Sequence, residues 1–394
     1  MKGEQERREN TLLKCVLFTF FVSGAAAQPL GSFIPFLRDA YGLGYDVSGA
    51  LLSAQSAGNL LAVLAAGLLP VYLGRRRTVL LTGVWMAVAY LIFAGGLGWG
   101  WLLLLSCFMN GIARGGNVNF ANTMVSTLPG SKATRGYNLL HAAYAVGAIL
   151  SPLLLIFCSG RWPGWGWRLV AGMLAALACA QMVVYARMDL PQEKLDRAGH
   201  RVVELGFLRD KTFWLGCLML FFYISTEYAI CGWLVTYFQD TGALSKSYAQ
   251  LTNSLYWVTV FAGRMVGAAL VGKVSRSKIL VADGLGVAVC FLLMYASSTP
   301  LAITLSLLGV GVFMATIYPS AFDFGSQSVK GNDLGCSLIA LIGTVGGVLT
   351  PLLVGLVAAR AGIRMGMAVV AGATVCLLGA ILLSVFLTRR QTES

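Results

Sequence analysis

The sequence predicts an all-α membrane protein with twelve transmembrane helices in two pseudo-symmetric six-helix bundles. Apolar residues make up 57% of the chain and charged residues only 11%, whereas a soluble domain carries roughly 25% charged residues. Twelve apolar stretches approach or exceed the roughly 20 residues that a spanning helix needs. The segment 145–154 also returns, with close similarity, at 344–353, an offset of 199 in a chain of 394 residues. This offset indicates two like halves.

The twelve predicted spans fall into two groups of six along the chain. The first follows eleven polar residues, and its apolar run exceeds the roughly 7–15 residues of a signal peptide core, so a retained helix is expected. A polar stretch, 188–210, separates the N-terminal bundle 1–187 from the C-terminal bundle 211–394 and is predicted to be a cytoplasmic linker. The expected spans are 12–37, 46–73, 78–97, 100–128, 136–158, 165–187, 211–239, 247–273, 278–297, 300–328, 333–359 and 364–387.

The distribution of positive charge predicts the orientation of these spans. With both termini in the cytoplasm, 21 of the 29 Lys and Arg residues lie on that side, six lie in outer loops and two lie within helices. Such an excess is typical of cytoplasmic loops. We therefore expect a protein of the cytoplasmic membrane with both ends inside.

Several function classes are disfavoured by composition. The net charge of +13 sits in short loops rather than on a basic helix, so nucleic acid is not an expected partner. The nine cysteines lie in apolar stretches without a Cys-x-x-Cys pair or Cys/His cluster, so no metal or other cofactor is expected. No phosphate-binding loop and no nucleophile–base set is present, which argues against ATP drive and against an enzyme. The expected partners are the lipid bilayer and a small solute, and the expected state is a monomer.

Ionisable groups inside spans are costly and often functional. Glu227 lies sixteen residues past Lys211, about 24 Å along a helix, beyond the reach of any loop lysine. It is predicted to bind and release a proton, with a satisfied structural acid as the alternative. Asp283 is expected to form a structural ion pair with Arg276 or Lys278.

Three further charged residues lie inside predicted spans. Asp323 fits either a structural or a gating role. Arg114 lies deep, where pairing with an acid and attraction of an anionic solute are both open. Arg264 lies about two turns from the cytoplasmic end of its span, where its side chain can reach the interface or pair across a gate.

Neutral polar residues cluster at helical spacing in several spans. Amides and aromatic rings suit sugar hydroxyls and sugar faces, although hydrogen bonds between helices also favour Asn and Gln. His141 lacks neighbouring ligands for a metal, so a hydrogen-bonding or proton-relay role is expected. These predicted solute-binding residues are Gln28, Gln55, Asn59, Asn119, Asn122, Asn138, His141, Tyr144 and Tyr223.

The twelve spans, the two halves and the loop from Gly67 to Arg77 resemble the major facilitator superfamily. Within that family, three stretches resemble the fucose/hexose–proton symporter branch. They are Gly111-Ile112-Ala113-Arg114-Gly115 with Arg135-Gly136-Tyr137-Asn138-Leu139-Leu140-His141, then Tyr223…Glu227…Gly232-Trp233, and Leu255-Tyr256-Trp257…Gly263-Arg264. The resemblance implies solute transport by alternating access around a central site, with proton or sodium coupling open. It adds Trp233 and Tyr256 to the predicted solute-binding residues.

The resemblance also implies a gating loop, Gly67…Gly74-Arg75-Arg76-Arg77, between the second and third spans. Val71 and Tyr72 stand where the family usually has Asp and Arg, so Arg75, Arg76 and Arg77 are expected to carry the gate charges. Val118 stands where relatives carry an acid, which leaves Glu227 as the main coupling residue. The alternatives are a drug or metabolite efflux antiporter of the same fold and a transport-inactive solute sensor.

Overall fold

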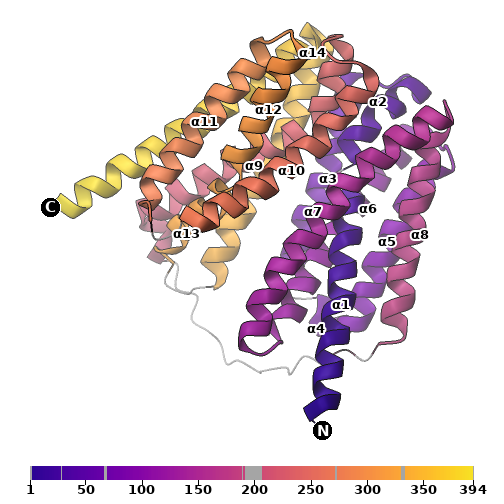
Figure 1. Cartoon of the computed structure of the whole chain (residues 1–394), viewed down its shortest axis with the longest axis horizontal. Helices are drawn as coiled ribbons and strands as arrows, with labels where there is room; N and C mark the ends of the chain where they lie inside the picture. Colours follow the sequence, from indigo (N-terminus) through magenta and orange to yellow (C-terminus); the bar gives the residue numbers. More distant parts are fainter. Residues whose placement is uncertain are drawn as a thin grey trace. The chain divides into compact units, whose positions relative to one another are not determined.

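The computed structural model describes residues 2–27, 29–65, 69–188, 190, 206–270, 273–329 and 333–393. Every regular element in these ranges is helical (Figure 1). Each of the twelve predicted spans lies on one or two of these helices, so the predicted fold class is confirmed. The helices of the N-terminal half are α1 (Lys2–Ala27), α2 (Leu30–Tyr41), α3 (Tyr45–Ala65), α4 (Leu69–Leu73), α5 (Arg75–Ala94), α6 (Gly100–Ser126), α7 (Gly130–Arg161) and α8 (Gly166–Ala186).

The C-terminal half has the same character. Its longest element, α14, contains two spans that are separated at Gly362, where φ is +84°, a conformation that glycine adopts without strain. The elements are the 3₁₀ turn η1 (Gly206–Arg209) and the helices α9 (Lys211–Asp240), α10 (Lys246–Leu270), α11 (Arg276–Ala296), α12 (Pro300–Met314), α13 (Ile317–Ser326) and α14 (Asp333–Glu393).

Two prolines coincide with breaks inside predicted spans. Pro29 lies between α1 and α2, and Pro319 follows the break between α12 and α13. Proline lacks the N–H that would bond to the carbonyl four residues earlier, so a continuous helix is interrupted there. Gln28 lies outside the described residues, as does most of the predicted linker.

The described helices differ in how apolar they are. Nine helical stretches in the described ranges are long and apolar enough to cross a membrane, and one of these, 335–387, contains both C-terminal spans. The two spans that fall short lie on α6 and α10. Both carry buried polar side chains, Asn110 and Asn117 on α6 and Gln250 and Asn253 on α10. Their lower hydropathy therefore reflects polar residues that face the protein interior rather than lipid.

The chain forms two compact units. The first comprises residues 1–43 and 54–197, and the second comprises 44–53 and 198–394. The beginning of α3 therefore groups with the second unit, although the sequence placed it in the N-terminal bundle. Its backbone approaches α14 closely, since a Cβ at Gly49 would lie 2.9 Å from the Pro351 carbonyl oxygen. The Ser53 hydroxyl also donates to the Val348 carbonyl at 2.7 Å.

The repeated segment, 145–154 and 344–353, makes the same kind of helix contact in each unit. In the first unit, a Cβ at Gly147 of α7 would lie 2.2 Å from the Phe21 carbonyl oxygen of α1. In the second unit, a Cβ at Gly346 of α14 would lie 2.4 Å from the Phe221 carbonyl oxygen of α9. Glycine at this position lets two backbones touch, as small residues do at helix interfaces in membranes. The duplication therefore preserves one close helix crossing in each half.

Buried polar contacts tie the helices of the first unit together. The Thr19 and Tyr185 hydroxyls lie 2.7 Å apart. The Thr82 hydroxyl donates to Oδ1 of Asn117 at 2.7 Å, and the Gln181 amide donates to the same oxygen at 3.0 Å. Since buried polar groups cost free energy unless they are hydrogen-bonded, these bonds allow polar side chains at membrane depth.

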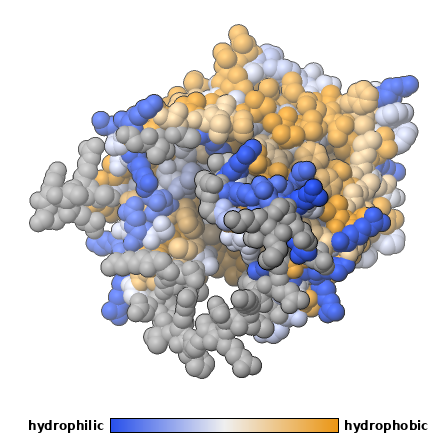
Figure 2. All heavy atoms as spheres, turned by 60° about the horizontal axis from the view of Figure 1, so that its bottom comes forward, coloured by the Kyte–Doolittle hydropathy of each residue, from blue (hydrophilic) through white to orange (hydrophobic). Residues whose placement is uncertain are grey.

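The outer surface fits a lipid environment. Figure 2 shows broad hydrophobic areas in the upper and right parts of this view, with hydrophilic residues mainly at the left and across the middle. Large apolar side chains are exposed on many helices, for example Phe157 at 66% and Leu301 at 71%. In a soluble protein such area would be unusual, whereas lipid tails cover it without cost.

Candidate functional site

The central acid of the predicted site lies on α9. This helix begins at the Asp210 cap, whose side chain accepts a hydrogen bond from the Thr212 N–H at 2.8 Å, a standard N-terminal cap. Four turns further, Tyr223 and Glu227 share a face, and the Tyr223 hydroxyl donates to Oε1 of Glu227 at 2.9 Å. Tyr223 is 1% exposed and Glu227 is partly buried. The carboxyl group is thus held in a defined position inside the second unit.

Other helices of the second unit add aromatic and charged groups around this pair. The Tyr223 ring meets the Tyr318 ring of α13 edge-on, with centroids 5.7 Å apart. Tyr256 of α10 and Tyr318 lie within electrostatic range of Glu227, and Arg264 lies within range of Tyr223 and Tyr256. The Tyr256 hydroxyl is buried and has no hydrogen-bond partner among the described residues. This cluster combines a carboxyl group, a guanidinium cation and hydroxyl groups; the carboxyl group can bind and release a proton, and the hydroxyl groups can bind a polar solute.

A polar stripe on α10 extends the site and was missed by the sequence analysis. Gln250, Asn253 and Ser254 are each 2% exposed, and Trp257 is 6% exposed. Gln250, Asn253 and Trp257 follow helical spacing and so share a face. That spacing was visible in the sequence. The signal that could have identified the stripe is the run of amide and hydroxyl residues within an otherwise apolar span.

In the first unit, predicted residues of α3 and α6 lie where these two helices contact each other closely. A Cβ at Gly111 would lie 1.9 Å from the Gln55 carbonyl oxygen, and one at Gly115 would lie 3.0 Å from Oδ1 of Asn59. The Asn119 amide donates to the Gly115 carbonyl at 2.9 Å. Gln55 is 7% exposed. These residues therefore lie at a close helix contact, and their solute-binding role stays a prediction.

Three predicted residues lie on α7. The His141 and Tyr144 rings each meet the Phe20 ring edge-on, with centroids 6.1 Å apart, and His141 is exposed. The Tyr137 hydroxyl donates to the backbone carbonyl of Asn122 at 3.3 Å. The Asn138 side chain lies outside the described part of the structure.

A cavity of about 150 Å³ lies inside the first unit among α3, α4, α5 and α6. Its polar lining includes Arg75 and Asn119, two residues that the sequence analysis assigned to different roles, together with Thr78 and Thr123. The Arg76 guanidinium, at the same end of α5, donates to the Ala186 carbonyl. Arg77 is exposed.

Trp233 lies in the core of the second unit. It is 0% exposed, and its indole N–H donates to the Pro351 carbonyl at 3.0 Å. Its ring also meets the Tyr45 ring, with centroids 6.2 Å apart. The Trp233 side chain therefore packs between α9 and α14 and is not accessible at the surface. A role in solute binding, which the sequence analysis assigned, stays a prediction.

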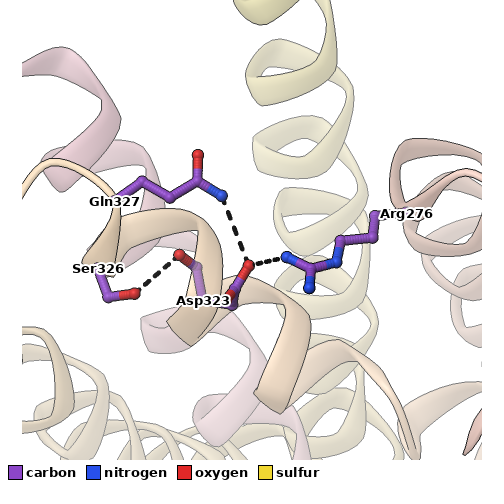
Figure 3. Close-up of polar contacts among 4 residues, drawn as sticks. All are labelled: Arg276, Asp323, Ser326 and Gln327. Atoms are coloured by element: carbon purple, nitrogen blue, oxygen red, sulfur yellow. Dashed lines mark hydrogen bonds and ion pairs between the residues drawn. The ribbon is translucent and has the colours of Figure 1, made fainter. Parts of the chain in front are cut away.

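The charged residues near the start of α11 pair differently from the sequence expectation. Figure 3 shows the Arg276 guanidinium contacting the Asp323 carboxylate, an ion pair between α11 and α13. The Gln327 amide donates to the same carboxylate at 3.5 Å. The Asp283 carboxyl group instead accepts a hydrogen bond from the Thr316 hydroxyl. The expected pairing of Asp283 with Arg276 does not form because the chain break after α12 brings Thr316 beside Asp283. Arg114 and Arg264 are both partly buried.

Among the described residues, no group of three or more His, Cys, Asp or Glu side chains is placed to hold a metal ion. The nine cysteines are free thiols.

Comparison with known proteins agrees with this architecture. The Major Facilitator Superfamily profile matches residues 16–340. A glucose/galactose transporter of Brucella abortus is 27% identical over 158 residues, which are 38% of this chain and 37% of that protein. The D-xylose–proton symporter structure superimposes with a TM-score of 0.78 at 12% identity, covering 96% of this chain and 97% of that chain. The Escherichia coli fucose:proton symporter gives 0.64 at 18% identity, covering 94% and 98%. With its membrane helices and duplicated halves, the chain belongs to the Major Facilitator Superfamily.

Proposed function

We propose that this integral membrane protein carries a small polar solute of the sugar class by alternating access, with Glu227 as its proton-binding group. The observation that carries the proposal is the bond from the Tyr223 hydroxyl to Glu227 inside a membrane-spanning helix. A carboxyl group at this depth is costly unless it has a function or a partner. Tyr223 supplies a partner that serves the protonated and ionised forms alike.

The solute class follows from the chemistry of the second unit and from the relatives. Hydroxyl and amide groups on α9 and α10 can exchange hydrogen bonds with sugar hydroxyls, and aromatic rings can cover sugar faces. The Brucella abortus relative is a glucose/galactose transporter, and the two structural neighbours are named as xylose–proton and fucose–proton symporters. The same groups would be poorly suited to an apolar drug, because its binding would leave them unsatisfied.

The orientation belongs to the same proposal. Both termini are assigned to the cytoplasm, because that arrangement puts 21 of 29 Lys and Arg residues on the cytoplasmic side. Tagging each terminus and probing its accessibility in intact cells tests this assignment. Labelling of either tag from outside would contradict it.

The transport proposal is tested in proteoliposomes with labelled hexoses, pentoses and a panel of apolar drugs. The intact protein should accumulate a sugar against its gradient when a pH gradient is imposed. Glu227→Gln should abolish gradient-driven accumulation yet retain sugar exchange at equal concentrations, because exchange requires no net proton movement. Tyr223→Phe keeps the ring and removes the donor, so it should weaken accumulation less severely.

One result would contradict the proposed proton coupling, and another would contradict the proposed solute class. Full gradient-driven accumulation by Glu227→Gln would remove the coupling role. Movement of apolar drugs with no sugar transport would indicate an efflux carrier of this fold instead.

A further inference from the structure

A second carboxyl group of the second unit lies at membrane depth without a charged partner. Asp283 is two turns into α11 and 8% exposed. The interaction that the structure gives its carboxyl group is the hydrogen bond from the Thr316 hydroxyl. Among the described residues it makes no ion pair. An ionised carboxylate in this position would be buried without a compensating charge, which is energetically unfavourable.

The charged and titratable groups on the packed elements do not supply that charge. Arg276 on the same helix is paired with Asp323 of α13. Tyr318 of α13 faces Tyr223 instead. The sequence of α12 contains no titratable residue.

The α14 side of this helix is apolar. Next to Asp283, the position of Gly284 faces Leu378 and Ile381 of α14. The nearest titratable residue of that helix stretch, Cys376, is exposed. On α12, α13 and this stretch of α14, the described residues therefore supply no ion-pair partner to the Asp283 carboxyl group.

The first unit shows what this position requires for packing alone. Thr82 lies 201 residues before Asp283, so the two occupy matching positions in the two halves. Asn117 lies 200 residues before Ile317, which follows Thr316 directly. There the Thr82 hydroxyl donates to Oδ1 of Asn117 at 2.7 Å, linking α5 to α6 with neutral groups. The duplicated fold thus closes this helix contact without a carboxyl group. The carboxyl group of Asp283 adds a capacity to ionise that the packing does not need.

We propose that Asp283 is a second proton-binding site of this carrier, separate from Glu227. The carboxyl group holds a proton while the Thr316 hydroxyl is its partner. It returns that proton to water when water reaches the junction of α12 and α13. The step forms a carboxylate and a hydronium ion and breaks only the carboxyl O–H bond. The site requires neither a particular solute nor the coupling role of Glu227.

Infrared difference spectroscopy of the purified full-length protein tests the site directly, without solute or gradient. Spectra recorded over a series of pH values should contain the C=O stretch of a protonated carboxyl group that disappears with rising pH. Asp283→Asn should remove one such component, since asparagine can still accept from Thr316 but cannot ionise. Asp323→Asn is the matched control and should leave that component in place, because Asp323 is ion-paired.

A second variant, Thr316→Val, keeps the proposal testable if Asp283→Asn does not fold. Thr316→Val is close to isosteric and removes only the donor, so the same component should change frequency while remaining present. A spectrum of Asp283→Asn identical to that of the parent protein would overturn the proposal, as would an unchanged frequency in Thr316→Val. Loss of proton-driven transport in Glu227→Gln, or its persistence, bears on the proposed function and leaves this readout unaffected.

Discussion

The close crossing of α1 and α7 gives a stability prediction that can be worked out from the structure. A Cβ added at Gly147 would lie 2.2 Å from the Phe21 carbonyl oxygen and 2.6 Å from the Ala25 nitrogen, whereas ordinary contact begins at 3.4 Å. Gly147→Ala therefore forces the two backbones apart by about 1 Å. Overpacking of this kind costs about 1–3 kcal/mol. Alanine also favours the helix by about 0.5–1 kcal/mol over glycine, so a net loss of up to about 2.5 kcal/mol is expected.

Gly172 of α8 supplies the matched control. A Cβ there meets no atom within 4 Å, so Gly172→Ala should be neutral or stabilising by about 0.5–1 kcal/mol. The two variants, purified in the same detergent, are compared by the midpoint of thermal unfolding under identical scan rates. The duplicated fold predicts the same ordering for Gly346→Ala and Gly372→Ala in the second unit. Equal or greater stability of Gly147→Ala relative to Gly172→Ala would refute the assignment of the repeated glycine to a backbone contact.

Two further changes test contacts at different depths. Trp233→Phe removes the donor to the Pro351 carbonyl and part of a fully buried ring. It should destabilise the protein by about 0.5–1.5 kcal/mol for the lost hydrogen bond, with a further loss from the cavity left by the smaller ring; an unchanged unfolding midpoint would contradict this. Lys132 lies outside the spans, and its hydrogen bond to Glu9 at 2.8 Å raises the pKa of Lys132. The stabilisation linked to the titration of Lys132 is therefore complete at neutral pH and is lost as the pH rises through the raised pKa of Lys132. Because the pair lies at the surface and is only partly buried, Lys132→Ala should lower the midpoint at neutral pH little or not at all. A clear drop in the midpoint would contradict this.

The sequence was sufficient for the helical spans and the duplication, since lipid requires long apolar runs whose backbone bonds are satisfied within each helix. It was also sufficient to single out Glu227, because a carboxyl group sixteen residues beyond the nearest loop lysine stands out in an apolar span. The Tyr223 contact was foreseeable for the same reason, since residues four apart share a helix face. These are local properties of one helix.

Pairings between helices were decided by the tertiary structure. Nearness in sequence suggested that Asp283 would pair with Arg276, yet Thr316, 33 residues away, bonds to Asp283, and Arg276 pairs with Asp323. The break after α12 and the contact of α11 with α13 set those distances, and neither is visible in the spacing along one helix.

The sequence by itself determined which faces are apolar, how many times the chain crosses the membrane and that its halves are alike. Only the tertiary structure decided what each polar residue meets, for example that Trp233 bonds to Pro351 and that Asn253 is buried. The physical reason is that helical periodicity fixes the direction of a side chain relative to its own axis. The neighbour that it meets depends on how closely the helices cross, which small residues such as Gly147 and Gly346 control.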